Sequence, residues 1–414
     1  MQTLKLGFIG AGFISRFQTR GLTQIHNAEL VGVYSVEGAG ELQRYARDQG
    51  VGDCKVYNSI KELCNNCDAV AMQVPNDVRI EIMEEIVEAV KAGAELKGII
   101  CDKPLGRTVD EAQRLVDLSK EAGLATAYHE NQIHMRSIQN ALSQLQPTQQ
   151  AMGPISLARS SEEHGGPHGA WFWDPTRQGG GVLADMGCHS IAVSWYVLTP
   201  FGKPVDFLEP VSISCDISLL KWGQPKYRKQ LLEKTGVDYS KVPADDFCTG
   251  VITFRNPETG QLVKGQFSNS WMYDKLGLRL LMEGLGPGYT FEMDSLRSPL
   301  EVFIGDAAAE AVADAETALE KATASRGLMA VQPNEADLYG YVDEMRDSVN
   351  AFLNGRKPLL DWEYGLKITR LVQAAYMAAE QKKTIDLTDH NVQKDLENFR
   401  SLVAQGKGGD VLYS

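Results

Sequence analysis

Two side chains that can exchange protons, Asp185 and His189, lie four residues apart in the apolar segment GGGVLADMGCHSIAVSWYVL, which spans residues 179–198. The segment predicts a buried helix, and residues at this spacing share one face of a helix. A carboxylate so placed orients an imidazole or holds its protonated form, and histidine titrates close to neutral pH. The pair favours an acid–base unit with His189 as proton acceptor. The alternative is a helix-capping aspartate beside a satisfied core histidine.

A third group of this kind, Lys103, ends the apolar run KGIICDKP at residues 97–104. A free lysine has a pKa of about 10.4, but desolvation or a neighbouring cation brings it to about 7–8, where it can transfer a proton. If it stays charged, it can hydrogen-bond an oxygen that becomes an alkoxide. Either role suits the oxidation of an alcohol, in which a base takes the hydroxyl proton while a hydride leaves. The alternative is a surface lysine in a loop.

These side chains need a scaffold, and the first 130 residues predict a doubly wound parallel sheet. Short apolar runs at residues 4–9, 28–35, 68–75, 97–104 and 125–129 indicate strands, and runs such as 40–49 and 78–92 indicate helices between them. Strands that alternate with helices of this length are typical of a parallel sheet. Ligands of such sheets bind at the carboxyl ends of the strands, which is where Lys103 stands.

The turn after the first strand, Gly10-Ala11-Gly12-Phe13-Ile14-Ser15, predicts a dinucleotide site. Its glycines let backbone amides and a helix N-terminus approach a pyrophosphate. Ser15 stands where a third glycine or alanine is usual, and the alternative is a tight turn without a ligand. A ribose-binding acidic residue is expected about 20 residues further on, and Ser35 lies there with no arginine beside it. NAD is therefore favoured slightly, and NADP stays open.

From about residue 153 the pattern changes to longer alternating strands, at GPISLARSS, VSISCDISL, CTGVITFRN, LVKGQFSNSWM and GLRLLMEGLG. They predict an open, mostly antiparallel sheet with a hairpin turn at FRNPETGQL. A charged insertion occupies residues 220–246, residues 307–325 are rich in alanine and glutamate, and residues 336–353 and 364–382 indicate amphipathic helices. The predicted division is a Rossmann domain at 1–130 and a substrate-binding and oligomerisation domain at 131–414, whose C-terminal helices could pack back on the first.

Composition limits the class of protein. The 414 residues are 43% hydrophobic, and 41 Lys and Arg against 54 Asp and Glu give a net charge of −13, which disfavours nucleic acid as a partner. No apolar run reaches the roughly 20 residues that span a membrane, and the N-terminus does not resemble a signal peptide. Seven scattered cysteines indicate reduced thiols. We expect a soluble, cytoplasmic protein of α/β class.

Four further stretches carry a resemblance: DAVAMQVPN, CDKPLGRT, GGGVLADMGCH and the C-terminal YVDEMRDSVNAFLNGRKPLLDWEYGLKITRLVQAAYMAAEQKKTIDL. Their order and spacing resemble the glucose–fructose oxidoreductase, inositol dehydrogenase and MocA (Gfo/Idh/MocA) family of NAD(P)-dependent oxidoreductases. The resemblance implies an N-terminal Rossmann domain and a C-terminal α/β domain, whose open sheet joins copies into a dimer or tetramer. It assigns the chemistry to Lys103, Asp185 and His189, and the reacting group to a secondary hydroxyl of a sugar, glycoside or cyclitol.

The predicted cofactor set joins the glycine turn to the strand ends: Gly10, Gly12, Phe13, Ile14, Ser35, Pro75, Asn76, Asp102, Lys103 and Glu130. Three positions depart from the family pattern. Asp102 replaces the usual glutamate, and Arg79 stands where a histidine is expected three residues after Asn76. Asn131 follows Glu130 where many relatives place an Asn and Arg pattern. These departures bear on the substrate more than on the chemistry.

The predicted substrate set is Lys103, His164, His168, Trp173, Arg177, Asp185 and His189. A tryptophan of EEHGGPHGAWFWDP (residues 162–175) could stack on a sugar face, with core packing as the equal alternative. A metal site built from His164, His168, His129 and Glu130 matches no metal motif. The single Cys64-Asn65-Asn66-Cys67 favours two thiols at a helix end over zinc or redox chemistry, so no metal is predicted.

Taken together, the motifs predict an NAD(P)-dependent dehydrogenase that acts on a small carbohydrate, without a nucleic-acid or membrane partner. Two alternatives stay open. One is an NAD-dependent enzyme that cleaves glycosides through a transient keto-sugar, with no net oxidation. The other is a non-catalytic regulator that senses NAD.

Overall fold

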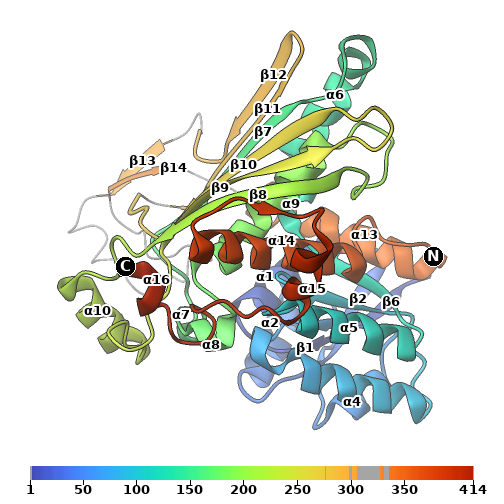
Figure 1. Cartoon of the computed structure of the whole chain (residues 1–414). Coiled ribbons are helices and arrows are strands. Elements are labelled where there is room, and N and C mark those ends of the chain that lie inside the picture. Colours follow the sequence, from blue (N-terminus) through green and yellow to red (C-terminus); the bar gives the residue numbers. More distant parts are fainter. Residues whose placement is uncertain (1, 276, 298–300, 305–326, 331–334, 414) are drawn as a thin grey trace. The chain divides into compact units, whose positions relative to one another are not determined.

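The computed structural model describes residues 2–275, 277–297, 301–304, 327–330 and 335–413 (Figure 1). The alanine- and glutamate-rich stretch at 307–325 lies outside them. The chain divides into two compact units. The first comprises Met1–Arg136 and Ala336–Arg370, and the second comprises Ser137–Glu335 and Leu371–Ser414. Residues 336–370, which the sequence division assigned to the second domain, thus belong to the first unit; the domain boundary at residue 130 itself stays a prediction.

The first unit is built on the parallel sheet that the sequence predicted. Its strand order is β3-β2-β1-β4-β5-β6, which is the usual strand order of a Rossmann fold. The strands are β1 (Leu4–Ile9), β2 (Ala28–Tyr34), β3 (Lys55–Val56), β4 (Ala69–Met72), β5 (Gly98–Asp102) and β6 (Ala125–His129). Central strands such as β4 are buried along their whole length, as expected when helices cover both faces.

Helices connect these strands, and two of them begin at a residue whose side chain caps the helix. They are α1 (Phe13–Leu22), α2 (Ala39–Asp48), α3 (Ile60–Cys64), α4 (Arg79–Lys91) and α5 (Val109–Glu121), with short 3-10 turns η1 (Asn76–Val78) and η2 (Asn131–His134). The side chains of Ser59 and Thr108 accept the first free amides of α3 and α5, which stabilises each helix start. The strands and helices therefore alternate as the hydrophobic pattern predicted.

A helix from far along the chain completes the core of the first unit. After α12 (Glu335–Leu338), helix α13 (Tyr341–Asn354) contributes Val342, Met345, Val349 and Phe352 to the cluster formed with β1, β2 and α1. The Phe352 ring lies so close to β5 that a Cβ on Gly98 would be 2.5 Å from it. Residues 336–370 therefore supply part of the core that packs against the parallel sheet.

The second unit holds a seven-stranded sheet in the order β12-β11-β7-β10-β9-β8-β15. Its strands are β7 (Leu157–Glu163), β8 (Glu209–Ser218), β9 (Phe247–Arg255), β10 (Leu262–Ser270), β11 (Arg279–Gly286), β12 (Tyr289–Asp294) and β15 (Ile385–Asp386); β13 (Glu301–Ile304) pairs separately with β14 (Gly327–Ala330). Neighbours pair antiparallel except β10 and β7. The expected mostly antiparallel sheet is confirmed, and the predicted hairpin turn joins β9 to β10.

Helices of the second unit pack on this sheet or join its strands. They are α6 (Arg136–Met152), α7 (Ala170–Trp173), α8 (Pro175–Gln178), the π-turn η3 (Leu183–Gly187), α9 (Cys188–Leu198), α10 (Pro225–Thr235), α14 (Trp362–Gln381), α15 (His390–Asn398) and α16 (Gly409–Leu412), α6 and α14 having their first residues in the first unit. All but one residue of α9 is buried, and it lies against β7 and β10. Such a helix, apolar on every side, is a core element.

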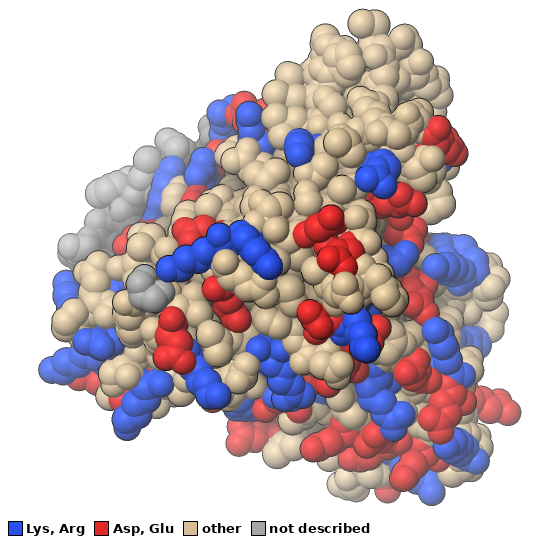
Figure 2. Space-filling view, in the orientation of Figure 1, with Lys and Arg blue, Asp and Glu red and all other residues tan. Residues whose placement is uncertain are grey.

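The surface seen in Figure 2 carries acidic and basic side chains side by side. The uncharged region at the top of that view corresponds to α6, in which no residue after Arg136 is charged. Within the described ranges, we find no helix that is both long and apolar enough to cross a bilayer.

Candidate active site

The glycine turn between β1 and α1 is shaped by a close backbone approach. Gly10 has a φ of +108°, and a Cβ there would lie 2.2 Å from the carbonyl oxygen of Gln73, so the position requires glycine. Its N–H donates to the carbonyl of Tyr34 at 2.8 Å. Ser15, at the third-glycine position, is fully buried and its hydroxyl donates to the carbonyl of Gly10 at 3.0 Å. The unusual serine therefore closes the turn from within.

The N-terminus of α1 fits a dinucleotide. Gly12 caps the helix without a side chain, and a Cβ there would meet no atom within 4 Å. This open space lies at the positive end of the helix dipole, where phosphate groups bind. A Cβ on Gly38 would lie 3.4 Å from the carbonyl of Ala11, so the loop that carries Ser35 borders the turn. The residues present thus suit a pyrophosphate and the adjoining ribose.

Replacing Gly12 by alanine is expected to weaken NAD binding about tenfold or more without harming the fold. The added methyl group would touch no protein atom within 4 Å, but it would enter the space through which a pyrophosphate reaches the helix amides. Isothermal titration with NAD and thermal unfolding measure the two effects. Gly40→Ala, at a second glycine with open space, is the control. Equal NAD affinity in both variants would contradict the site.

Lys103 follows β5 at the carboxyl edge of the parallel sheet, the same edge that the glycine turn occupies. It is half-buried between Asp102 and Pro104. Arg79, which is 3% exposed at the start of α4, donates to the carbonyls of Pro104 and, at 3.2 Å, of Leu105. The arginine that replaces an expected histidine therefore holds the segment after Lys103 in place.

A buried hydrogen-bond network supports the residue before Lys103. Gln18 of α1 donates from Nε2 to Asp102 Oδ1 at 3.1 Å, and the same nitrogen lies 3.1 Å from His129 Nδ1. The side-chain amide of Gln73 donates in turn to the side-chain oxygen of Gln18, Oε1. His129 Nε2 lies 3.1 Å from the hydroxyl of Ser348 in α13. The network links the cofactor-side helix, the end of β5, the end of β6 and α13.

The protonation states of this network follow from burial. Desolvation lowers the pKa of His129 to about 3, so the imidazole is neutral; Nδ1 accepts from Gln18, and Nε2 donates to Ser348, whose hydroxyl donates to the carbonyl of Glu344 at 3.0 Å. The Glu344 side chain lies 3.4 Å from His129. Desolvation, with Asp102 and Glu130 nearby, raises the pKa of Glu344 well above its usual value.

The pKa of His129 predicts a loss of stability in acid. The unfolded histidine binds a proton below pH 6.5, whereas the folded one does so only below about 3, so the free energy of unfolding falls as pH drops through this window, by up to about 1.4 kcal/mol per pH unit. His129→Gln should flatten that fall in urea titrations between pH 6.5 and 5, whereas His390→Gln, at an exposed histidine, should follow wild type. An equally steep fall in His129→Gln would contradict the assignment.

In the second unit, Asp185 and His189 lie on successive turns of different type. The predicted buried helix is confirmed, but the turn that carries Asp185 is not α-helical: Asp185 belongs to the π-turn η3, and His189 to the first turn of α9. Both side chains are 4% exposed. π-Turns widen a helix and are frequent at functional sites, so the i, i+4 geometry of a plain α-helix does not describe this pair.

Each member of the pair has a partner from the sheet. The indole nitrogen of Trp271 donates to Asp185 Oδ2 at 3.3 Å, and His189 Nε2 lies 4.0 Å from Glu162 Oε2 at the end of β7. Asn269 of β10 donates to the Ser190 hydroxyl at 2.8 Å, which fixes α9 on the sheet. The site therefore holds a carboxylate with a neutral donor and an imidazole facing a second carboxylate.

Two of the glycines before η3 lie in close contact with other parts of the chain. A Cβ on Gly180 would lie 2.2 Å from the Tyr376 hydroxyl, and a Cβ on Gly181 would lie 2.2 Å from the carbonyl oxygen of Asp245. Both approaches come from within the second unit, from Tyr376 of α14 and from Asp245, two residues before β9. The glycine run thus serves internal packing, in addition to the predicted approach to ligands.

The other predicted substrate residues divide into buried and exposed groups. His164 is 2% exposed and its Nδ1 accepts the amide of Gly166 at 2.9 Å. Trp173 is also 2% exposed, and its indole donates to the carbonyl of Pro167, so core packing accounts for both side chains as placed. His168 and Arg177 are exposed. Their contacts with a substrate stay predictions.

Lys103 belongs to the first unit, whereas Asp185 and His189 belong to the second. Their joint action on one substrate stays a prediction. Sequence reasoning missed several residues that hold them: Gln18, Gln73, Ser348, Glu344, Glu162, Asn269, Trp271 and Asp245. The sequence signal that could have indicated them is a polar residue at the end or in the middle of an apolar run, such as Gln18 of α1.

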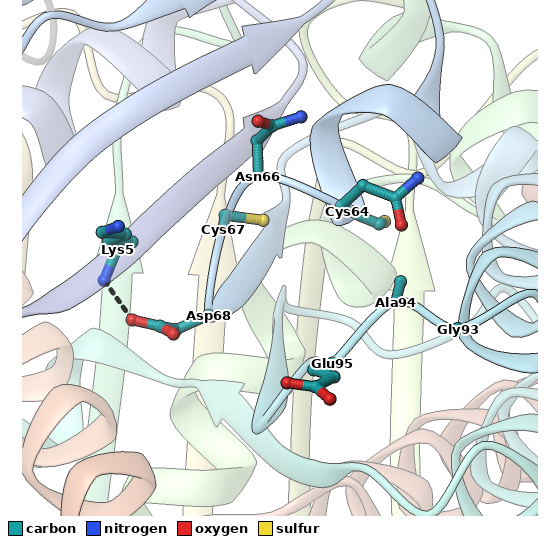
Figure 3. A pocket seen from close by; sticks show the side chains of 9 residues that line it. Lys5, Cys64, Asn66, Cys67, Asp68, Gly93, Ala94 and Glu95 are labelled. Atoms are coloured by element: carbon teal, nitrogen blue, oxygen red, sulfur yellow. Dashed lines mark hydrogen bonds between the residues drawn. The ribbon is translucent and has the colours of Figure 1, made fainter.

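A polar cavity of about 410 Å³ opens at the opposite, amino edge of the parallel sheet (Figure 3). Cys64, Cys67 and Asp68 line it, and Asp68 accepts the backbone amide of Lys5 at 2.9 Å. Burial raises the pKa of Cys64 to about 12 and that of Cys67 still further, so both remain inert thiols. Among the residues that the structure describes, no cluster of three metal-ligand side chains occurs.

Comparison with known proteins identifies both parts of the chain. Residues 4–129 match the model of the GFO/IDH/MocA oxidoreductase family with its NAD-binding Rossmann fold, and residues 148–281 match the C-terminal domain of that family. The chain is 28% identical over 221 residues to 1,5-anhydro-D-fructose reductase of Ensifer adhaerens, which covers 52% of this chain and 62% of that protein. It is 24% identical over 391 residues to D-glucoside 3-dehydrogenase of Escherichia coli strain K12, covering 93% and 97%.

The crystal structure of GenD2 from gentamicin A biosynthesis, in complex with NAD, shares the fold with a TM-score of 0.70 at 19% identity, over 94% of this chain and 97% of that one. Over its match, the present chain spans less than two thirds of the length of the Ensifer reductase. The two family models together cover more than half of the chain. The chain therefore belongs to the GFO/IDH/MocA family of oxidoreductases, with an NAD-binding Rossmann fold in its N-terminal part.

Proposed function

We propose that the protein oxidises a secondary hydroxyl of a sugar, glycoside or cyclitol to a ketone, with NAD as hydride acceptor. The observation that carries the proposal is the 3.1 Å hydrogen bond from Gln18 to Asp102. It ties the helix that follows the glycine turn to the strand end that carries Lys103, so one polar network serves the dinucleotide cradle and the lysine. The carbohydrate-directed names of the two relatives support the substrate class.

The chain's own groups divide the proton chemistry in this proposal. Bound NAD supplies the hydride acceptor. Lys103 hydrogen-bonds the reacting oxygen and stabilises negative charge that develops there. His189 accepts the hydroxyl proton, and the carboxylate of Glu162, 4.0 Å from its Nε2, stabilises the resulting cation. Asp185 orients the substrate by accepting a hydrogen bond from a neighbouring hydroxyl.

The decisive experiment is the absorbance of reduced nicotinamide, followed with purified protein, NAD or NADP, and a panel of sugars, glycosides and cyclitols. A steady rise with one substrate and NAD supports the proposal. Release of an aglycone without net reduction would replace it by the redox-neutral cleavage, and NAD binding without turnover of any compound would replace it by a sensor. The Lys103→Ala variant is the negative control.

The exposed face of the seven-stranded sheet supports a homo-oligomer. Along β10, Leu262, Lys264 and Gln266 are exposed and alternate with buried residues, so this face of the strand lies open in the single chain. We expect a dimer or tetramer in solution, measured by light scattering. A monomer at micromolar concentration would contradict this expectation.

A further inference from the structure

One carboxylate joins the two ends of the charged insertion at residues 220–246. Asp246 is fully buried, and its Oδ1 accepts the amide of Leu220 at 2.7 Å. Its Oδ2 accepts the amides of Lys221 and Trp222 at 2.8 and 2.7 Å. Asp246 therefore binds the beginning of the insertion to its end. Between them, α10 packs against α7 (Figure 1).

The preceding carboxylate binds the loop that leads to Asp185. Asp245 is fully buried; its Oδ1 accepts the amide of Gly181 at 3.1 Å and the hydroxyl of Tyr376 at 3.0 Å. Its Oδ2 accepts the amide of Leu183 at 2.9 Å, and its carbonyl accepts Val182 at 2.8 Å. Two successive aspartates thus anchor the insertion on one side and the glycine loop on the other.

Trp271 connects the same two segments to Asp185 directly. Its amide donates to the carbonyl of Asp246 at 2.8 Å, and its own carbonyl accepts the indole N–H of Trp222 at 2.9 Å. The Trp271 ring is fully buried and lies 5.1 Å from that of Trp173. Both the backbone and the ring of Trp271 are therefore held, and its indole N–H points at Asp185 Oδ2 at 3.3 Å.

We propose that Trp271 is a positioning residue for Asp185, and that the insertion acts on the reaction by holding Trp271 through Asp246 and Trp222. The inference rests on the proposed role of Asp185 in substrate binding. The indole N–H fixes the rotamer of the carboxylate and supplies a donor to its charged form. Without that N–H, Oδ2 of the buried carboxylate loses one hydrogen bond, and the carboxylate is held less firmly toward a substrate hydroxyl.

Trp271→Phe removes the donor and keeps an aromatic ring. We expect kcat to fall about 10- to 100-fold, the KM for the carbohydrate to rise, and the KM for NAD to stay unchanged, because the glycine turn is untouched. A merely structural role would instead lower the melting temperature and affect both KM values or neither. Unchanged kcat and KM in a folded Trp271→Phe protein would overturn the proposal.

A spectroscopic readout tests the contact without any substrate. The chain has six tryptophans, and the indole ¹⁵N–¹H signal of Trp271 is assigned in the full-length wild-type protein from its connectivity to the backbone signals. Asp185→Asn should move that signal upfield, because a carboxylate acceptor becomes an amide. A signal that does not move would show that the hydrogen bond is absent and would overturn the proposal even if Trp271→Phe fails to fold.

Asp246→Asn tests the link to the insertion. In this variant the side-chain NH₂ of the asparagine would face backbone N–H donors, so residues 220–222 should detach from position 246. The Trp271 indole signal should then shift, and kcat should fall. Asp238→Asn is the matched control in the same insertion, because the Asp238 side chain bonds within its own turn, to Ser240 and Lys241. Identical spectra for Asp246→Asn and wild type would exclude the insertion from the mechanism. If no carbohydrate is turned over, the proposed function fails while the indole measurements still decide the contact.

Discussion

Lys103→Ala should lower kcat about 10²- to 10⁴-fold, the range over which a positioned acid–base group acts. The lysine stands at the carboxyl edge of β5, beside Asp102, whose side chain is held by Gln18 at 3.1 Å. Its removal takes the amino group away from the reacting oxygen but removes neither partner of the hydrogen bond from Gln18 to Asp102. The dissociation constant of NAD should change by less than about tenfold, because the glycine turn holds the pyrophosphate.

Steady-state kinetics and calorimetric titration with NAD measure both quantities. Lys97→Ala is the matched control, because Lys97 precedes the same strand at its opposite end and pairs with Asp68 at 3.9 Å. That variant should turn over at the wild-type rate. A Lys103→Ala protein with wild-type kcat would remove the lysine from the proposed mechanism.

Gly181→Ala should unfold the loop before Asp185. The new Cβ would lie 2.2 Å from the carbonyl oxygen and 2.6 Å from Oδ1 of Asp245, and both atoms are fixed by hydrogen bonds. Overpacking of this kind costs about 1–3 kcal/mol, and relief requires Asp245 to release the amides of Gly181 and Leu183. We expect the free energy of unfolding to fall by about 3 kcal/mol and turnover to disappear.

Urea unfolding and the nicotinamide assay measure these effects. Gly165→Ala is the control in the same unit, because a Cβ there would meet its nearest atom at 3.5 Å, an ordinary contact. If both variants were equally stable and active, the close approach of Asp245 to the glycine loop would be refuted.

Local patterns predicted most of the fold, and two of the three misses have physical causes. The apolar runs gave β1, β5 and β6 nearly to the residue, since buried parallel strands need continuous apolar sequence. β3 (Lys55–Val56) was missed because it has two residues, both exposed. β12 (Tyr289–Asp294) was also missed, although its aromatic or apolar residues alternate with polar ones, which is the pattern of a strand. The π-turn at 183–187 has no periodicity that distinguishes it from an α-helix.

The candidate site was predictable where motifs are local. Gly10 and Lys103 stand next to strand ends that sequence identifies, and their places follow from sheet geometry. The residues that hold them do not, because Gln18 and Asp102 are 84 residues apart and Asp185 and Trp271 are 86 apart. Such partners depend on which segments the fold brings together, and a single sequence does not display that pairing.

The discontinuous core of the first unit limits how this family member can be rearranged. Val342, Met345 and Phe352 belong to the cofactor-side core, although six of the seven strands of the second sheet lie between them and β6 in the sequence. A gene fragment that encodes residues 1–136 alone would leave the Gly98 side of the sheet bare and prone to aggregate. Exchange of cofactor modules between relatives by recombination therefore requires two crossovers, one for the N-terminal segment and one that carries residues 336–370 with it.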